Sequence, residues 1–129
     1  MLKIREQAIV PFTPAADYSA KRGYLVTLSG VTATLSASAT VPATGVIMEG
    51  GVDANDSVQV GILGAINGSV MMKTSGAITA GARVQQAADG TIVTDAGAGN
   101  ARVVVGVALE TGVSGDLIEV APLAPMILP

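Results

Sequence analysis

Hydrophobic and polar residues alternate along short stretches of the chain with a period of two. In residues 31–38, one face consists of Val31, Ala33, Leu35 and Ala37, and the positions between them are Thr or Ser. That alternation is typical of a β-strand with one face in a core. Short β-branched runs separated by Gly, Asp and Asn predict further strands at residues 24–28, 44–49 and 117–121. No segment has the pattern of a long amphipathic helix, so we expect little helix.

A predicted strand over residues 102–110 is apolar on both faces. Val103, Val105, Val107 and Leu109 fill one face, and Val104, Gly106 and Ala108 fill the other. Such a strand lies either at the centre of a sandwich or under a partner that covers its outer face. If the second face is the outer one, Val104 and Ala108 are candidates for an oligomer interface.

Two Gly-containing dipeptides predict tight β-hairpins. Asn67-Gly68 separates residues 57–66 from 69–74, and Asp89-Gly90 separates residues 83–86 from 91–94. Asn-Gly and Asp-Gly supply the positive φ angles that a two-residue type I′ turn requires. We therefore expect the two strands on either side of each turn to pair with each other.

The two halves of the chain are similar to each other. The pattern Gly-Val-x-x-Glu-x-Gly-Val occurs at residues 45–52 and again at 106–113, followed by Asp-x-Val/Ile-x-Val at 56–60 and 116–120. Two such units can bury their apolar faces against each other. The sequence therefore predicts a single all-β domain over residues 21–121, a small barrel or sandwich built from two repeats at about 21–63 and 77–121.

Both ends of the chain lie outside these repeats. Residues 1–20 suit an extended N-terminal arm that either pairs with a partner's sheet or packs on its own domain. The candidate contact residues of this arm are Leu2, Ile4, Ile9, Val10, Pro11 and Phe12. Residues 122–129 form an apolar, uncharged, Pro-rich tail that we expect to dock on its own domain or on a neighbouring subunit. Met126, Ile127 and Leu128 therefore join the candidate oligomer interface.

The composition excludes most kinds of chemistry. The 129 residues contain no His, Cys or Trp; 50% are hydrophobic and 13% are charged, with a net charge of -3. Without His or Cys, the usual zinc sites, thiol nucleophiles and imidazole bases are impossible. The acidic balance argues against a nucleic-acid partner, which needs a basic surface. The apolar runs are shorter than the ~20 residues of a membrane-spanning helix, so we expect no membrane partner and no cofactor.

Two acidic features are weak candidates for chemistry. Residues 53–57 carry oxygen-bearing side chains with the spacing of a calcium loop, but Val58 and Gly64 stand where that loop needs Gly and Glu. Glu49 and Glu110 occupy equivalent repeat positions, with no nucleophile or metal-ligand set beside them in the sequence. We interpret the first feature as a solvated turn and the second as two strand ends. We therefore expect no catalytic residue and no metal site.

Four glycine-and-valine motifs follow one another in the second repeat, at residues 77–84, 89–93, 105–110 and 115–120. Their order resembles that of the small capsid decoration (cement) proteins of tailed bacteriophages and prophages. The resemblance implies a β-rich, non-enzymatic virion protein that is made in the host cytoplasm and lies on the outer capsid surface. It also implies a homo-oligomer, with a trimer favoured, that stabilises the head by bridging subunits of the major capsid protein.

Two other functions stay open at this point. A carbohydrate-binding or other binding module on a phage fibre or surface would stack sugars on exposed aromatic rings, for which the chain offers Phe12, Tyr18 and Tyr24. A phage tail or baseplate subunit would share the structural class of a decoration protein and differ only in its partner.

Overall fold

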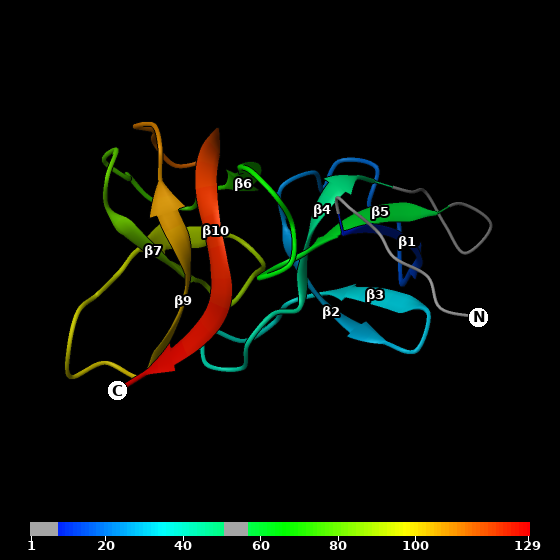
Figure 1. The fold of residues 1–129 in the computed structure, drawn as a ribbon, viewed down its shortest axis with the longest axis horizontal. Coiled ribbons are helices and arrows are strands. Elements are labelled where there is room, and N and C mark those ends of the chain that lie inside the picture. Colours follow the sequence, from blue (N-terminus) through cyan, green and yellow to red (C-terminus); the bar gives the residue numbers. More distant parts are fainter. Residues whose placement is uncertain (1–7, 51–56) are drawn as a thin grey trace.

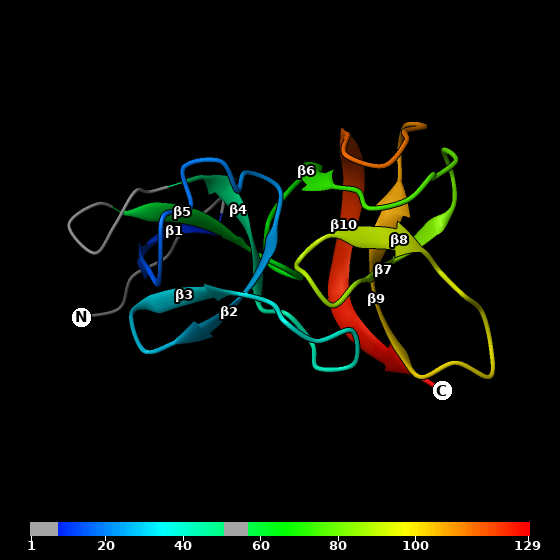
Figure 2. The ribbon, with the colours of Figure 1, turned by 180° about the vertical axis from the view of Figure 1, so that it is seen from behind.

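In the computed structural model, which describes residues 8–50 and 57–129, every regular element is a β-strand (Figure 1). The strands are, in chain order, β1 (Ile9–Pro14), β2 (Leu25–Ser29), β3 (Thr32–Leu35), β4 (Gly45–Glu49), β5 (Val58–Ile62), β6 (Val70–Lys73), β7 (Arg83–Gln86), β8 (Ile92–Thr94), β9 (Arg102–Ala108) and β10 (Leu117–Leu128). They form two five-stranded units that lie side by side (Figures 1 and 2). The predicted all-β class and its two β units are confirmed. Within the described residues, no helix is long and apolar enough to cross a membrane.

The first unit, β1 to β5, is a closed barrel with the strand order β1-β3-β2-β4-β5. β1 pairs antiparallel with β5, so that Phe12 lies opposite Val58 and Val10 opposite Val60. A short parallel pairing of β1 with β3, which includes Thr13 and Thr32, closes the ring. The barrel interior is aliphatic, with one buried tyrosine, and consists of Tyr18, Val26, Ala33, Ile47, Val58 and Val60.

The second unit, β6 to β10, is a curved sheet with the strand order β6-β10-β9-β7-β8. Its two edge strands approach each other at a single parallel bridge between Thr74 and Ile92. Next to this bridge, the N–H of Ser75 donates to the carbonyl of Ile92 at 3.1 Å. The long strand β10 pairs with β6 only over residues 117–120, and its later residues pair with β9.

The two units share one strand order. β6, β7, β8, β9 and β10 take the places of β1, β2, β3, β4 and β5, and the parallel contact between the first and third strands recurs. The register recurs as well. Phe12 pairs with Val58 in the first unit, and Met72 pairs with Ile118 in the second, and each residue of the second pair is sixty positions later in the sequence. The sequence repeat is therefore a structural repeat. It also includes β1 and β6, which sequence comparison left outside.

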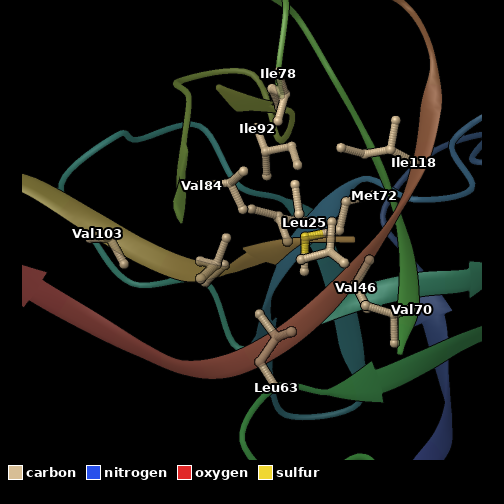
Figure 3. Packing of buried hydrophobic residues seen from close by; sticks show 14 residues of the cluster. Leu25, Val46, Leu63, Val70, Met72, Ile78, Val84, Ile92, Val103 and Ile118 are labelled. Carbon is tan, nitrogen blue, oxygen red and sulfur yellow. The ribbon is translucent and has the colours of Figure 1, made fainter. Parts of the chain in front are cut away.

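A single apolar core joins the two units (Figure 3). Leu25, Val46 and Leu63 of the first unit pack in one cluster with the buried aliphatic side chains of the second. Leu25 and Val46 face each other across β2 and β4, on the opposite side of these strands from the barrel interior. The outer face of the barrel therefore completes the core of the second unit. Burial of each such side chain contributes roughly 1.5–3 kcal/mol.

A buried amide ties the units together beside this core. Gln86 of β7 is fully buried, and its Nε2 donates to the carbonyls of Ser38 (2.7 Å) and Val41 (2.6 Å). Its Oε1 accepts a hydrogen bond from the N–H of Ala43 at 3.0 Å. A buried amide is costly when it lacks partners. These bonds therefore fix the loop that leads from β3 to β4 against the second unit.

Of the two predicted hairpins, the one at Asp89-Gly90 is confirmed. β7 and β8 pair with each other, but the turn differs in length from the prediction. The N–H of Ala87 donates to the carbonyl of Thr91 at 2.8 Å, which leaves three residues in the loop. Gly90 has a φ of +85°, as expected at the left-handed position of a three-residue hairpin loop.

The predicted hairpin at Asn67-Gly68 is wrong. The flanking strands β5 and β6 lie in different units and do not pair with each other. The chain turns before this dipeptide, where the N–H groups of Ala65 and Ile66 donate to the carbonyl of Ile62. Leu63 and Ile66 then pack into the core between the units. Burial of these side chains outweighs the local preference of Asn-Gly for a hairpin.

Candidate functional site

The described N-terminal contact candidates lie in the barrel wall. Ile9, Val10, Pro11 and Phe12 all belong to β1 and pair with β5. Pro11 is exposed, whereas the other three are partly buried. β5 and β3 use both edges of β1, so residues 9–14 belong to the barrel and not to an arm that is free to reach a partner. Leu2 and Ile4 lie outside the described residues.

The structure corrects the prediction that Val104 and Ala108 form one exposed face. Val104 is 0% exposed and Ala108 is 1% exposed. Both pairings of β9 shift register between Val104 and Gly106, which is the signature of a β-bulge. Val103 and Val105 face the core before the bulge, and Ala108 faces it afterwards. Val104 and Ala108 therefore lie on opposite faces of the sheet, and neither is available to a partner.

A charged cluster covers the outer face beside Val104. Arg102, two residues away on the same face, is 5% exposed and donates through Nε to the carboxylate of Asp95. Arg83 donates to the other oxygen of that carboxylate at 2.7 Å. Arg102 also donates through Nη1 to the carbonyl of Pro129 at 2.8 Å. These bonds hold the loop between β8 and β9 and the end of β10 together.

The environment of Asp95 favours the ionised carboxylate. Burial raises the pKa of Asp95, but the N–H of Gly97 and the guanidinium groups of Arg102 and Arg83 lower it by more. The net result is a pKa below the ordinary value of an aspartate. This ionised group accepts hydrogen bonds that fix the loop, and its role is structural.

The predicted tail residues form the end of β10. Met126 and Leu128 pair with Val104 and Arg102 and therefore lie on the outer face of the sheet. Ile127 pairs with Val103 and lies on the core side, although it is 64% exposed. Strand pairing with β9 therefore docks this segment on its own domain. The three candidate interface residues Met126, Ile127 and Leu128 are divided between two faces.

An apolar band follows the outer face of β9 and β10. Its members are uncharged side chains that the strand register and its alternation place on this face, namely Val107, Leu109, Ala121, Leu123, Met126 and Leu128. Leu109, Leu123 and Met126 are 48%, 37% and 45% exposed. The sequence pattern predicted Met126 and Leu128 as interface residues and missed the other four. Val107 and Leu109 were missed because the bulge reverses which side of β9 faces outward. We call this set the outer band.

The aromatic side chains do not form an exposed platform in the described part of the chain. Tyr18 is 5% exposed, and its Oη accepts a hydrogen bond from the N–H of Leu35 at 3.1 Å. Phe12 and Tyr24 pack against the same barrel core. The Nζ of Lys21 lies 4.7 Å from the ring centroid of Tyr24. Sugar-binding sites present aromatic faces to solvent. In this protein the aromatic rings pack against the barrel core instead.

The structure does not bring the acidic candidates together. Glu49 ends β4 in the first unit, whereas Glu110 follows β9 in the second and accepts a hydrogen bond from the N–H of Glu119 at 2.6 Å. Residues 53–56 of the predicted solvated turn lie outside the described residues. Among residues 8–50 and 57–129, no group of three or more acidic side chains is placed to hold a metal ion.

Comparison with known proteins finds a similar fold and no similar sequence. No protein-family model matches the chain, and no curated protein matches it in sequence. Among solved structures, the N base of the head fibre protein gp8.5 of bacteriophage phi29 is similar over 94% of this chain and 92% of its own, with a TM-score of 0.60 and 15% identity. Because the match covers 94% of this chain, the similarity of fold includes strands of both units.

Proposed function

We propose that this chain is a non-enzymatic structural protein of a phage virion. In this proposal it forms a homo-oligomer, with a trimer favoured, on the outer surface of the capsid. There it stabilises the head by bridging subunits of the major capsid protein.

The observation that carries the proposal is the end-to-end match with the phage head fibre base. The match covers 94% of this chain and therefore includes strands of both units. A fold alone does not determine function. Here, however, the sequence motifs of the second repeat independently resemble phage decoration proteins, so two separate observations favour the same class of protein.

The surface chemistry fits a protein that works through contacts. The outer band is apolar and partly exposed, and apolar surface of this kind is typical of a protein–protein contact. The described ion pairs and buried polar groups all serve the fold: Gln86 joins the units, and Arg102 and Asp95 fix a loop. A scaffold of this kind presents rigid surfaces, which is what a shell-binding protein requires.

Co-sedimentation tests the proposal against its closest alternative. The purified chain is mixed with expanded capsid shells of the phage that carries it and, separately, with tails of the same phage, and each mixture is pelleted. We expect the chain to pellet with the shells at a saturating number of copies. Pelleting with tails alone would assign it to the tail or baseplate, and absence from both pellets would contradict a virion role.

A further inference from the structure

We infer that the outer band of β9 and β10 is the surface through which a second copy of this chain binds. The inference deepens the proposed function and rests on the oligomerisation that it includes. The structural repeat supports this face and this partner, because the equivalent face of the first unit is buried by another β unit of the chain.

The first step is the equivalence of positions in the two units. β5 and β10 correspond with an offset of sixty residues, because Val58 and Val60 pair with β1 as Ile118 and Val120 pair with β6. With the same offset, Leu63 corresponds to Leu123. Ile66 and Met126 correspond in sequence offset alone, because the first unit turns at Gly64 while β10 continues. On the neighbouring strands, the pair of Leu25 with Val46 corresponds to the pair of Arg83 with Val107.

The second step is what covers this face in the first unit. Leu25 and Val46 are 0% exposed, Leu63 is 7% exposed, and Ile66 packs against the same cluster. The body that buries them is the second unit, a β unit with the same strand order. The molecule therefore contains one example of this face under a cover, and that cover is the core side of another β unit of the same chain.

The third step is the state of the same face in the second unit. Leu123 and Met126 keep the apolar character of Leu63 and Ile66, but they are 37% and 45% exposed. Where the first unit has Gly64 with a φ of +87° and turns away, the second has Ala124 and Pro125, and β10 continues to Leu128 through a register shift against β9. The apolar face is thus retained in the second unit, where it is partly exposed.

The fourth step is the charge of the face. Residues 120–128 of β10 contain no ionisable side chain, although edge and surface strands of monomers commonly carry charges that prevent association. Charged side chains lie at the borders of the band: Arg83 replaces Leu25, and Arg102 lies opposite Leu128. Asp95 pairs with both arginines. The exposed Glu119 precedes Ala121 on the same face of β10. An uncharged apolar band suits an equally uncharged apolar partner, and a second copy of the band provides one.

Light scattering during size-exclusion chromatography tests this inference on the full chain. The variants Leu123→Glu and Met126→Glu place a charge in the outer band. Val31→Glu is the matched control, because Val31 is 72% exposed in the turn between β2 and β3 of the other unit. We expect the wild type and the control to have the same oligomeric mass, and each band variant to dissociate at a protein concentration at least tenfold higher than the wild type does.

Chemical cross-linking gives a second measurement that does not need a disruptive substitution. The chain has no cysteine, so Met126→Cys provides a single thiol, with Val31→Cys as the control. A short bifunctional thiol reagent is expected to join two copies through position 126 and not through position 31. The inference is overturned if both glutamate variants keep the wild-type mass, or if position 126 gives no more cross-link than position 31.

The same experiments separate this inference from the proposed function. A wild-type oligomer that the band variants leave intact contradicts the choice of face, while the capsid role still depends on co-sedimentation. A wild type that stays monomeric at high concentration contradicts the inference and the proposed oligomer together. Failure to pellet with shells contradicts the proposed function even if the band joins two copies.

Discussion

At the residue scale, the side chains that stand out by burial and charge connect parts of the fold. Gln86 is a polar side chain at the centre of the molecule, and it reaches three backbone groups of the other unit at 2.6 to 3.0 Å. Arg102 connects two segments within the second unit. Its Nη1 donates to the carbonyl of Asn100, in the loop before β9, and to the carbonyl of Pro129, at the end of β10. In the described part of the chain, every buried side-chain nitrogen and oxygen has a hydrogen-bond partner.

Replacement of Gln86 by Ala is expected to destabilise the protein by roughly 2–4 kcal/mol, because it leaves buried backbone groups of the loop without partners. Urea unfolding measures the change. Gln59→Ala is the matched control: Gln59 makes a weak 3.4 Å bond to Ser57 in an exposed place, and its loss should change stability by less than about 0.5 kcal/mol. Equal effects of the two substitutions would show that Gln86 does not join the units.

Asp95 predicts a pH dependence with a definite sign. Its pKa is lowered in the folded protein, so its contribution to stability is complete above the ordinary aspartate pKa, about 3.9, and is lost as the pH falls through the lower folded value. The free energy of unfolding of the wild type should therefore exceed that of Asp95→Asn at pH 7, and the difference should shrink in acid. A difference that is constant between pH 7 and pH 2 would contradict this role.

At the element scale, β9 shows how much of the fold the sequence could predict. Strand positions followed from the alternation of residues 31–38 and from turn residues such as Asp89-Gly90. The inner and outer faces of β9 did not, because Val103, Val104 and Val105 are chemically alike and give no sign of a bulge. The apolar band was therefore only partly predicted, through Met126 and Leu128. The role of β1 was missed because its pairing partners are distant in the sequence.

The close packing of β10 against Gly106 of β9 can be tested with a single methyl group. A Cβ on Gly106 would lie 2.6 Å from the carbonyl oxygen of Ala121 and 2.6 Å from a methyl of Val120. Gly106→Ala is therefore expected to lower the free energy of unfolding by roughly 2 kcal/mol through overpacking. Gly76→Ala is the control, since its nearest neighbour would be an ordinary 3.8 Å away. Thermal unfolding followed by circular dichroism compares the two, and equal stabilities would contradict the close approach of β10 to Gly106.

At the scale of the whole molecule, the shared core predicts that the two units unfold together. Leu63 lies in this core, and Leu63→Ala should cost roughly 3 kcal/mol without separating the transition into two. The two tyrosines, Tyr18 and Tyr24, both belong to the first unit and the chain has no tryptophan. Tyr24 also lies beside Gly90 of the second unit, so tyrosine fluorescence reports on the first unit and on its contact with the second. Circular dichroism reports on both units, and we expect the two curves to coincide. Separate midpoints would show that the units fold independently.

The same rigidity bears on function, because a two-unit body held by a common core presents its surfaces at fixed positions. The outer band lies on the second unit, and the shared core joins that unit to the barrel.

Electron cryomicroscopy of expanded capsid shells incubated with the purified chain tests the central claim most directly. The account predicts ordered density on the outer shell surface, into which the closed barrel and the curved sheet fit, with each oligomer touching at least two subunits of the major capsid protein. Shells that carry no added density at saturating concentrations of the chain would contradict it.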